Sequence, residues 1–146
     1  MSIDQRAAAA AECQRLSHAF ACLVDHGQAD RVAELFTADG SFERRGERLV
    51  GRDEIRKAIN SRSTVVVSRH LCSTTFVDIT SASTATGVTY FELHKYEWPD
   101  GQAAQGRVAP LGAPEVIGEY HDEFVLTAEG WRIRARAARG VFRREG

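Results

Sequence analysis

The sequence has few residues of the kinds that cross-link or anchor a chain. Its 146 residues include three cysteines, three prolines and one methionine. Because the cysteines (Cys13, Cys22 and Cys72) form no CxxC pair, neither a disulfide framework nor a zinc ribbon is supported. No apolar run approaches the roughly 20 residues of a membrane span, and the first residues include acids and Gln where a signal peptide needs an apolar stretch. We therefore expect a cytoplasmic protein with no membrane partner.

The chain also lacks an excess of charge of either sign. Nineteen basic and 20 acidic residues give a net charge of −1, so no global field favours nucleic acid as a partner. Only Lys57 and Lys95 of the basic residues are lysines. With 43% apolar and 27% charged residues, the composition is that of an ordinary globular chain, and the length predicts a single domain over residues 1–146.

Several motifs that bind cofactors or carry out hydrolysis are missing. The sequence contains no GxGxxG, Walker loop, GxSxG or HExxH, and its glycines stand singly at predicted turns. Nucleotide binding and serine hydrolase chemistry are therefore poorly supported, and we expect no cofactor.

The first part of the chain is predicted to be helical. From Ile3 to about His26 there is no Pro or Gly, and apolar residues recur with the spacing of one buried helix face. Two shorter helices follow, giving predicted helices over residues 3–26, 29–36 and 53–59. Between the last two we expect a short strand at 41–43 and a polar loop at 46–51.

From Thr64 onward the hydrophobic period changes to two, which is typical of strands. The pattern predicts four long strands, over residues 65–79, 85–98, 115–127 and 131–142. A loop over 99–114 and a tight turn at Glu129-Gly130 separate them. Helices followed by an antiparallel meander indicate an α+β fold with the helices on one face of the sheet.

Histidines are the best candidates for acid–base chemistry near neutral pH. His70 is predicted to share a strand face with Cys72, Thr74 and Phe76. This semi-apolar face suits a pocket wall, but a structural, hydrogen-bonded histidine has the same pattern.

Two further histidines lie on predicted strand faces that are mostly polar. His94 shares a face with Tyr90 and Glu92, and His121 shares one with Glu119 and Glu123. Either face could be a solvated sheet surface. A metal site would require His94, His121 and Glu123 to converge, which nothing in their spacing demands, so we expect no metal.

The last two predicted strands contain candidate surface features. Alternation places Arg132, Arg134 and Arg136 on one sheet face, as a solvated or subunit-facing row or, alternatively, an anion or RNA site. Tyr120 and Phe124 on one strand, with Ile133 and Ala135 on the next, predict an exposed apolar patch. Such patches usually indicate a partner, and we expect a homodimer or a higher homo-oligomer.

The order of these elements resembles the SnoaL-like branch of the nuclear-transport-factor-2-like superfamily. The matching phrases lie at residues 20–30, 35–40, 51–55, 69–70, 118–122 and 130–133. Members of this superfamily are similar in having a curved sheet wrapped by helices into a cone around a ligand cavity. The resemblance thus implies a cone-shaped antiparallel sheet wrapped by three N-terminal helices.

The site pattern is similar to that of scytalone dehydratase and related bile-acid dehydratases. In those enzymes a carboxylate late in the first long helix orients a strand histidine that acts as general base. Asp25 matches the carboxylate and His70 the histidine, while His121 falls near a polar pocket position. Two tyrosines of that pattern are replaced, by Val24 and near Arg44, so the resemblance leaves Tyr90, His94 or His121 to supply the electrophile.

Together these observations predict a lyase or isomerase of the dehydratase or cyclase type, acting on a hydrophobic, oxygenated ring compound. The predicted cavity wall comprises Phe20, Val24, Phe76, Phe91 and Leu93. Other members of the superfamily bind ligands without catalysis, assist assembly or serve as small subunits of aromatic-ring dioxygenases, so these roles remain alternatives.

Overall fold

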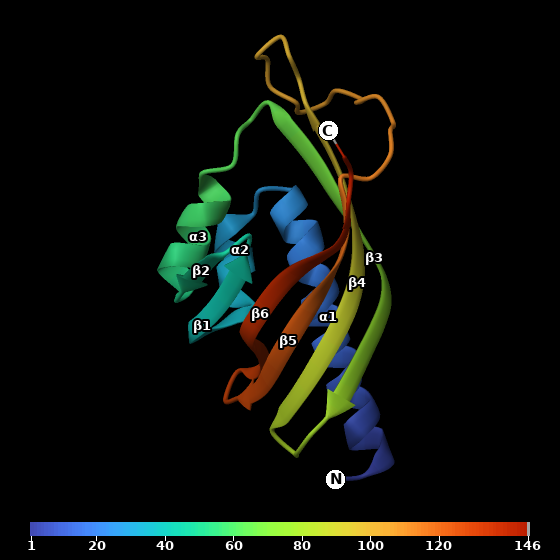
Figure 1. Cartoon of the computed structure of the whole chain (residues 1–146). Coiled ribbons are helices and arrows are strands. Elements are labelled where there is room, and N and C mark those ends of the chain that lie inside the picture. The colour runs from blue at the N-terminus through green and yellow to red at the C-terminus, as the bar shows by residue number, and fades with distance from the viewer. Residues whose placement is uncertain (146) are drawn as a thin grey trace.

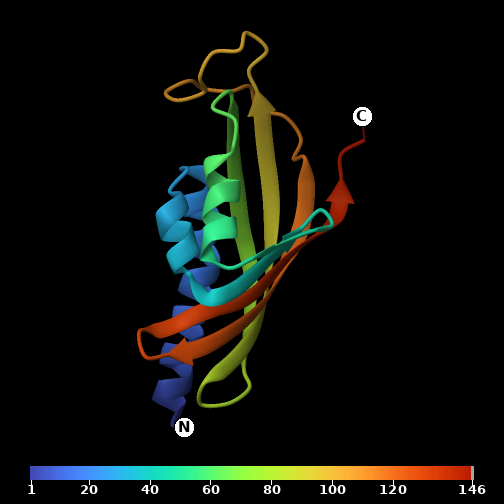
Figure 2. The ribbon, with the colours of Figure 1, turned by 90° about the vertical axis from the view of Figure 1, so that its left-hand side faces the viewer.

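The predicted helices and long strands all form in the computed structural model, which describes residues 1–145. The helices are α1 (Ile3–Asp25), α2 (Ala29–Glu34) and α3 (Arg52–Asn60). The strands are β1 (Phe36–Arg44), β2 (Glu47–Val50), β3 (Val66–Ile79), β4 (Thr84–Glu97), β5 (Val116–Thr127) and β6 (Gly130–Arg143). All three helices lie on the same side of the curved sheet (Figures 1 and 2).

Helix α1 positions the first candidate residue because both of its ends are well defined. At its start, Ser2 and Gln5 exchange side-chain and backbone hydrogen bonds in a capping box. At its end, Gly27 adopts a φ of 67°, which stops the helix at low steric cost. Asp25 is therefore the last helical residue, and the adjacent Val24 is buried. None of the helices within residues 1–145 has the length and apolarity needed to cross a membrane.

The sheet is mixed rather than wholly antiparallel. Its six strands have the order β2-β1-β6-β5-β4-β3, and β3 to β6 form the predicted antiparallel meander. Strand β1, however, pairs parallel with β6. This correction reflects a contact between segments far apart in the sequence, which local turn signals do not specify. The expected loop at 46–51 also proves to contain strand β2, joined to β1 by the turn Arg45-Gly46.

A β-bulge in β3 changes which residues face the helices. Cys72 pairs with Phe91, but Thr75 pairs with Thr89, so β3 gains one residue relative to β4. Beyond the bulge the alternation is inverted, and Phe76 is 67% exposed on the outer face. The prediction that Phe76 lines the cavity is therefore wrong.

A second bulge divides the predicted arginine row on β6. Ile133 pairs with Phe124, whereas Ala135 pairs with the adjacent Glu123. As a result Arg136 faces the helices and is 1% exposed, while Arg134 remains exposed. These arginines do not form one solvated row.

Three of the four residues of the predicted exposed patch on β5 and β6 belong to the core, and the fourth, Ala135, is half-buried on the outer face. Tyr120, Phe124 and Ile133 are each at most 2% exposed, because this face of the sheet is covered by α1. Apolar side chains are exposed instead on the opposite, outer face. They include Leu71, Phe76, Tyr90, Ile117 and Phe142, and we call this set the outer apolar patch.

Candidate functional site

A cavity of about 600 Å³ lies between the helices and the inner face of the sheet. Strands β3 to β6, the end of α1, the end of α3 and the β1–β2 turn all contribute to its wall. Its apolar lining includes Phe20, Val24, Phe42, Phe91, Leu93 and Val116. Four of the predicted wall residues (Phe20, Val24, Phe91 and Leu93) are thus in place. A volume of this size is typical of small-molecule sites, and the lining combines apolar side chains with charged and hydroxyl-bearing ones.

The two residues of the predicted dyad are in direct contact at this cavity. Asp25 Oδ1 lies 2.7 Å from His70 Nδ1, and Asp25 Oδ2 accepts a hydrogen bond of 2.7 Å from the His70 backbone N–H. The aspartate side chain is 3% exposed and the histidine side chain 14%. The carboxylate therefore holds both the ring and the backbone of the histidine.

This contact determines the chemical form of the neutral imidazole. An anionic carboxylate accepts, so His70 Nδ1 carries the proton and Nε2 keeps a free lone pair. No hydrogen bond within residues 1–145 involves Nε2, and His70 lines the cavity. His70 can therefore take a proton from a group bound there.

Two further side chains hold Asp25 in place. Ser68 Oγ donates to Asp25 Oδ1 at 2.8 Å, and Arg62 in turn donates to Ser68 Oγ at 2.6 Å and to the Val24 carbonyl. Burial alone would raise the pKa of Asp25, but the hydrogen bonds and charge interaction with His70 and the hydrogen bond from Ser68 lower it below its ordinary value of 3.8. The carboxylate therefore stays ionised at neutral pH.

Sequence reasoning did not identify Ser68 and Arg62 as part of the site. Ser68 precedes His70 by two residues and so shares its strand face. The two-residue spacing from His70 could therefore have identified Ser68 as a site residue. Arg62 lies in the connection after α3, where no periodicity applies.

Tyr120 is the one phenol among the hydroxyl-bearing residues that line the cavity within residues 1–145. Its ring stacks on that of Phe91, with 4.4 Å between the two ring centroids. The Phe91 and His70 ring centroids are 5.9 Å apart. No hydrogen bond within the described residues involves the Tyr120 hydroxyl. Burial raises the pKa of Tyr120, so the phenol keeps its proton and can donate it in a hydrogen bond.

A close approach between strands makes room for this stack. A Cβ atom on Gly118 would lie 2.6 Å from the ring of Phe91 and closer still to the Arg139 carbonyl. Only glycine fits this position, which lies beside a bulge in the β5–β6 ladder. Gly118 therefore sets where the Phe91 and Tyr120 rings lie.

Behind Tyr120 a buried ion pair fixes the inner face. Arg136 donates to both carboxylate oxygens of Asp122, at 2.6 and 2.7 Å, and to Ser17 Oγ at 2.6 Å. Its guanidinium lies 4.0 Å from the Tyr120 ring centroid and 4.6 Å from that of Phe20. The ion pair is wholly buried, so it supports the cavity wall and does not contact a ligand.

The structure does not bring the other predicted site residues to this cavity. Tyr90 is 46% exposed on the outer face. His94 pairs with Glu92 at 3.3 Å and His121 with Glu119 at 2.9 Å, both on that same outer face. Alternation along β4 and β5 explains this, because Phe91 and Tyr120 take the inward positions. None of these three residues can supply the electrophile.

The outer histidines also do not converge with acids to form a metal centre. Among residues 1–145, no three His, Cys, Asp or Glu side chains are grouped so that they could hold a metal ion.

Solved structures of low sequence identity share this fold. Rv3472, a protein of unknown function from Mycobacterium tuberculosis, matches with a TM-score of 0.77 and 23% identity, over 96% of this chain and 76% of that one. A candidate scytalone dehydratase from Novosphingobium aromaticivorans matches with a TM-score of 0.80 and 17% identity, over 99% and 92% of the two chains. An NTF2-like protein with a cystatin-like fold from the same organism matches with a TM-score of 0.70 and 20% identity, over 89% and 80%. These likenesses establish the fold.

The sequence itself supports a more specific assignment. No curated protein matches it significantly. The SnoaL-like domain family matches residues 5–137, which run from the first turn of α1 to the middle of β6. This match covers nearly the whole chain and both members of the Asp25–His70 pair. The chain therefore belongs to the SnoaL-like domain family.

Proposed function

We propose that this protein is a lyase or isomerase of the dehydratase type, acting on a hydrophobic, oxygenated ring compound. The observation that carries the proposal is the 2.7 Å contact between Asp25 Oδ1 and His70 Nδ1 at the wall of an apolar cavity. A carboxylate on one imidazole nitrogen is the arrangement that makes the other nitrogen a general base. A similar fold in a candidate scytalone dehydratase is consistent with this chemistry.

The proposed reaction moves a proton within the cavity. His70 Nε2 removes a proton from a carbon next to a ring carbonyl, and the electron pair of that C–H bond passes into an enolate. The Tyr120 hydroxyl donates a hydrogen bond to the enolate oxygen, where negative charge develops. Protonated His70 then returns the proton, either to a leaving hydroxyl, which departs as water, or to another carbon of the ring. The step consumes no oxidant or reductant.

Deuterium exchange tests the proton transfer without knowledge of the substrate. In D2O, the wild-type protein is expected to speed loss of the NMR signal next to the carbonyl of bicyclic ketones such as 1-tetralone. His70→Gln should slow this exchange by about 10²-fold or more, because it removes the general base. His94→Gln is the matched control, since His94 lies on the outer face of the same sheet, and should exchange at the wild-type rate.

Two outcomes would contradict the proposal. Exchange that persists in His70→Gln would assign the base elsewhere. Binding of ketones without any exchange would favour a non-catalytic ligand-binding domain. Tyr120→Phe provides a second check, because it should bind the ketone yet exchange about 10–100-fold more slowly through loss of one donor to the enolate oxygen.

We also propose that the protein forms a homodimer through its outer apolar patch. Phe76 and Phe142 are 67% and 65% exposed there, and Leu71 is 53% exposed. Several large apolar side chains together on one sheet face favour burial against a partner, and a second copy with two-fold symmetry is the commonest partner.

A further inference from the structure

Cationic side chains are concentrated among the residues that line the cavity. Six of its lining residues are basic and one is acidic, in a chain whose net charge is −1. The basic residues are Arg44, Arg45, Arg62, Lys95, Arg139 and Arg143, and the acid is Glu115. Arg139 pairs with the outward Glu119 and also lines a hollow on the outer face, so five of the six cations belong to this cavity alone. The local excess of positive charge is therefore a feature of this site and does not follow from composition.

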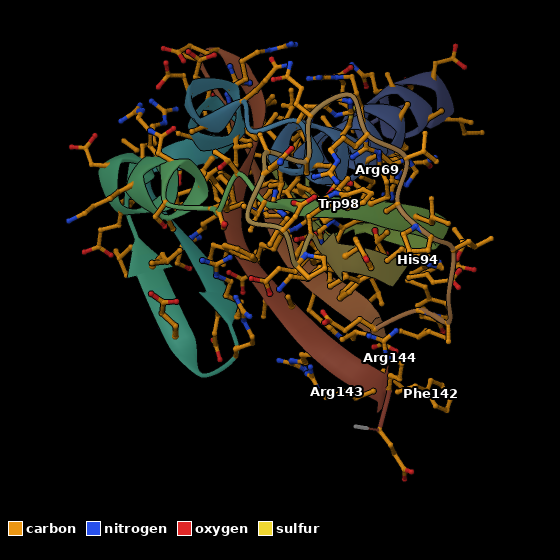
Figure 3. All side chains as sticks on the ribbon, turned by 90° about the horizontal axis from the view of Figure 1, so that it is seen from above. Arg69, His94, Trp98, Phe142, Arg143 and Arg144 are labelled. Atoms are coloured by element: carbon orange, nitrogen blue, oxygen red, sulfur yellow. The ribbon has the colours of Figure 1, made fainter. Side chains whose placement is uncertain are left out.

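Most of these cations have no acidic partner among the residues that the structure describes. Within residues 1–145, Arg44 is the one member in an ion pair, a long contact of 3.9 Å to Glu47. Arg62 is held by neutral oxygens, those of Val24 and Ser68. Figure 3 shows that Arg143, on the inner side, and Phe142 point to opposite sides of β6. Unneutralised positive charge therefore surrounds an apolar chamber.

Among the basic residues of the cavity, Arg44 has the environment least favourable for a charged side chain. Its side chain is 23% exposed, and its Nε is buried with no hydrogen-bond partner among the described residues. Burial lowers the pKa of Arg44, and the neighbouring charges of Arg45 and Arg62 lower it further. The Nε–H is closed off from solvent, so the donors that Arg44 offers a ligand are its other guanidinium nitrogens, which no hydrogen bond within residues 1–145 occupies.

The adjacent turn has a second unfavourable feature. Arg45 has a φ of 46°, in the left-handed region that non-glycine residues rarely adopt. A two-residue hairpin turn of this kind usually has Asn or Asp before Gly. Arg45 therefore adds its charge to those of Arg44 and Arg62, although its own backbone conformation is unfavourable for a non-glycine residue.

We propose that the ring compound taken by this cavity carries a carboxylate, which Arg44 binds while the ring packs against Phe42 and Phe91. Arginine forks match the planar geometry of a carboxylate and form strong, charge-assisted hydrogen bonds. The apolar lining behind them suits the ring, and His70 faces the same chamber. This inference rests on the proposed function for the role of the ligand as substrate. The preference for an anionic over a neutral ligand can be measured by binding alone, whether or not the protein converts the ligand.

Calorimetric titration with two ligands of equal shape tests the inference. The wild-type protein should bind 2-naphthoate about tenfold more tightly than neutral 2-naphthamide. Arg44→Gln should remove most of that preference and leave naphthamide binding within about twofold. Arg48→Gln is the matched control, because Arg48 lies on the same hairpin but outside this cavity, and it should behave as wild type. A third ligand, 2-naphthyl phosphate, should bind no more tightly than naphthoate.

The inference is overturned if the amide binds as tightly as the acid, if neither binds, or if Arg44→Gln and Arg48→Gln have equal effects. A phosphate bound more tightly than naphthoate would overturn the choice of carboxylate. Loss of proton exchange in His70→Gln with naphthoate binding unchanged would support the base and the anion site separately. Failure of the proposed base and failure of the proposed anion site therefore give different results.

Discussion

At the scale of single residues, Asp25 has the most consequential position. It ends helix α1 and contacts two atoms of His70 and one of Ser68. Ideal helical spacing places Asp25 away from the main apolar stripe of α1, so periodicity alone does not predict its burial. Its pairing with His70 was predictable from the family resemblance. The structure explains it, because β3 runs beside the last turn of the helix and covers its flank.

Asp25→Asn should therefore destabilise the protein in a pH-dependent way. The pKa of Asp25 is lowered in the folded state, so the carboxylate contributes stability above its ordinary value of 3.8, and this contribution is lost as pH falls through the lower folded value. We expect urea unfolding to show a loss of about 1–3 kcal/mol at pH 7. The difference from wild type should shrink below about pH 4. An equal difference at pH 3 and pH 7 would contradict the assignment of an ionised, hydrogen-bonded carboxylate.

At the scale of secondary structure elements, two bulges decide which side chains reach the cavity. Helices α1 to α3 and the β3–β6 meander were predictable, because helical and strand periods and turn glycines are local signals. One extra residue in β3 turns Phe76 outward, and one in β6 turns Arg136 inward. A bulge is a shift in pairing between two strands, so the hydrophobic pattern of one strand does not predict where it occurs. The parallel β1–β6 pairing is likewise a long-range contact, so the cationic lining that it helps to form was not foreseen.

The pair Asp122–Arg136 should be the largest single electrostatic contribution to the β5–β6 ladder. Both side chains are fully buried, so Asp122→Leu leaves the Arg136 charge without its counterion. We expect a loss of about 3–5 kcal/mol in urea unfolding at pH 7. The double variant Asp122→Leu with Arg136→Met should recover much of this, because it also removes the buried charge. A loss below about 1 kcal/mol in the single variant would show that the pair is not sealed from water.

At the scale of the whole molecule, the sheet separates two surfaces with different roles. The inner face holds the dyad and the cavity, and the outer face carries the outer apolar patch. If a second copy covers that patch, light scattering should give the mass of a dimer at micromolar concentration. Phe142→Asp should shift the protein towards monomer, whereas Val108→Asp, in the exposed loop between β4 and β5, should not. A monomeric wild type would refute the dimer.

The central claim is that ligands bind on the inner face of the sheet, against His70. Histidine side chains on both faces can test it, because each gives its own imidazole NMR signal. The most direct measurement is an imidazole ¹H–¹⁵N correlation spectrum recorded while 1-tetralone is added. We predict that His70 carries its proton on Nδ1, held by Asp25, and that its Nε2 signal shifts saturably with ligand. The signals of His94 and His121 should stay in place, because both side chains pair with glutamates on the outer face. Saturable shifts at His121 or His94 with an unchanged His70 would contradict the account.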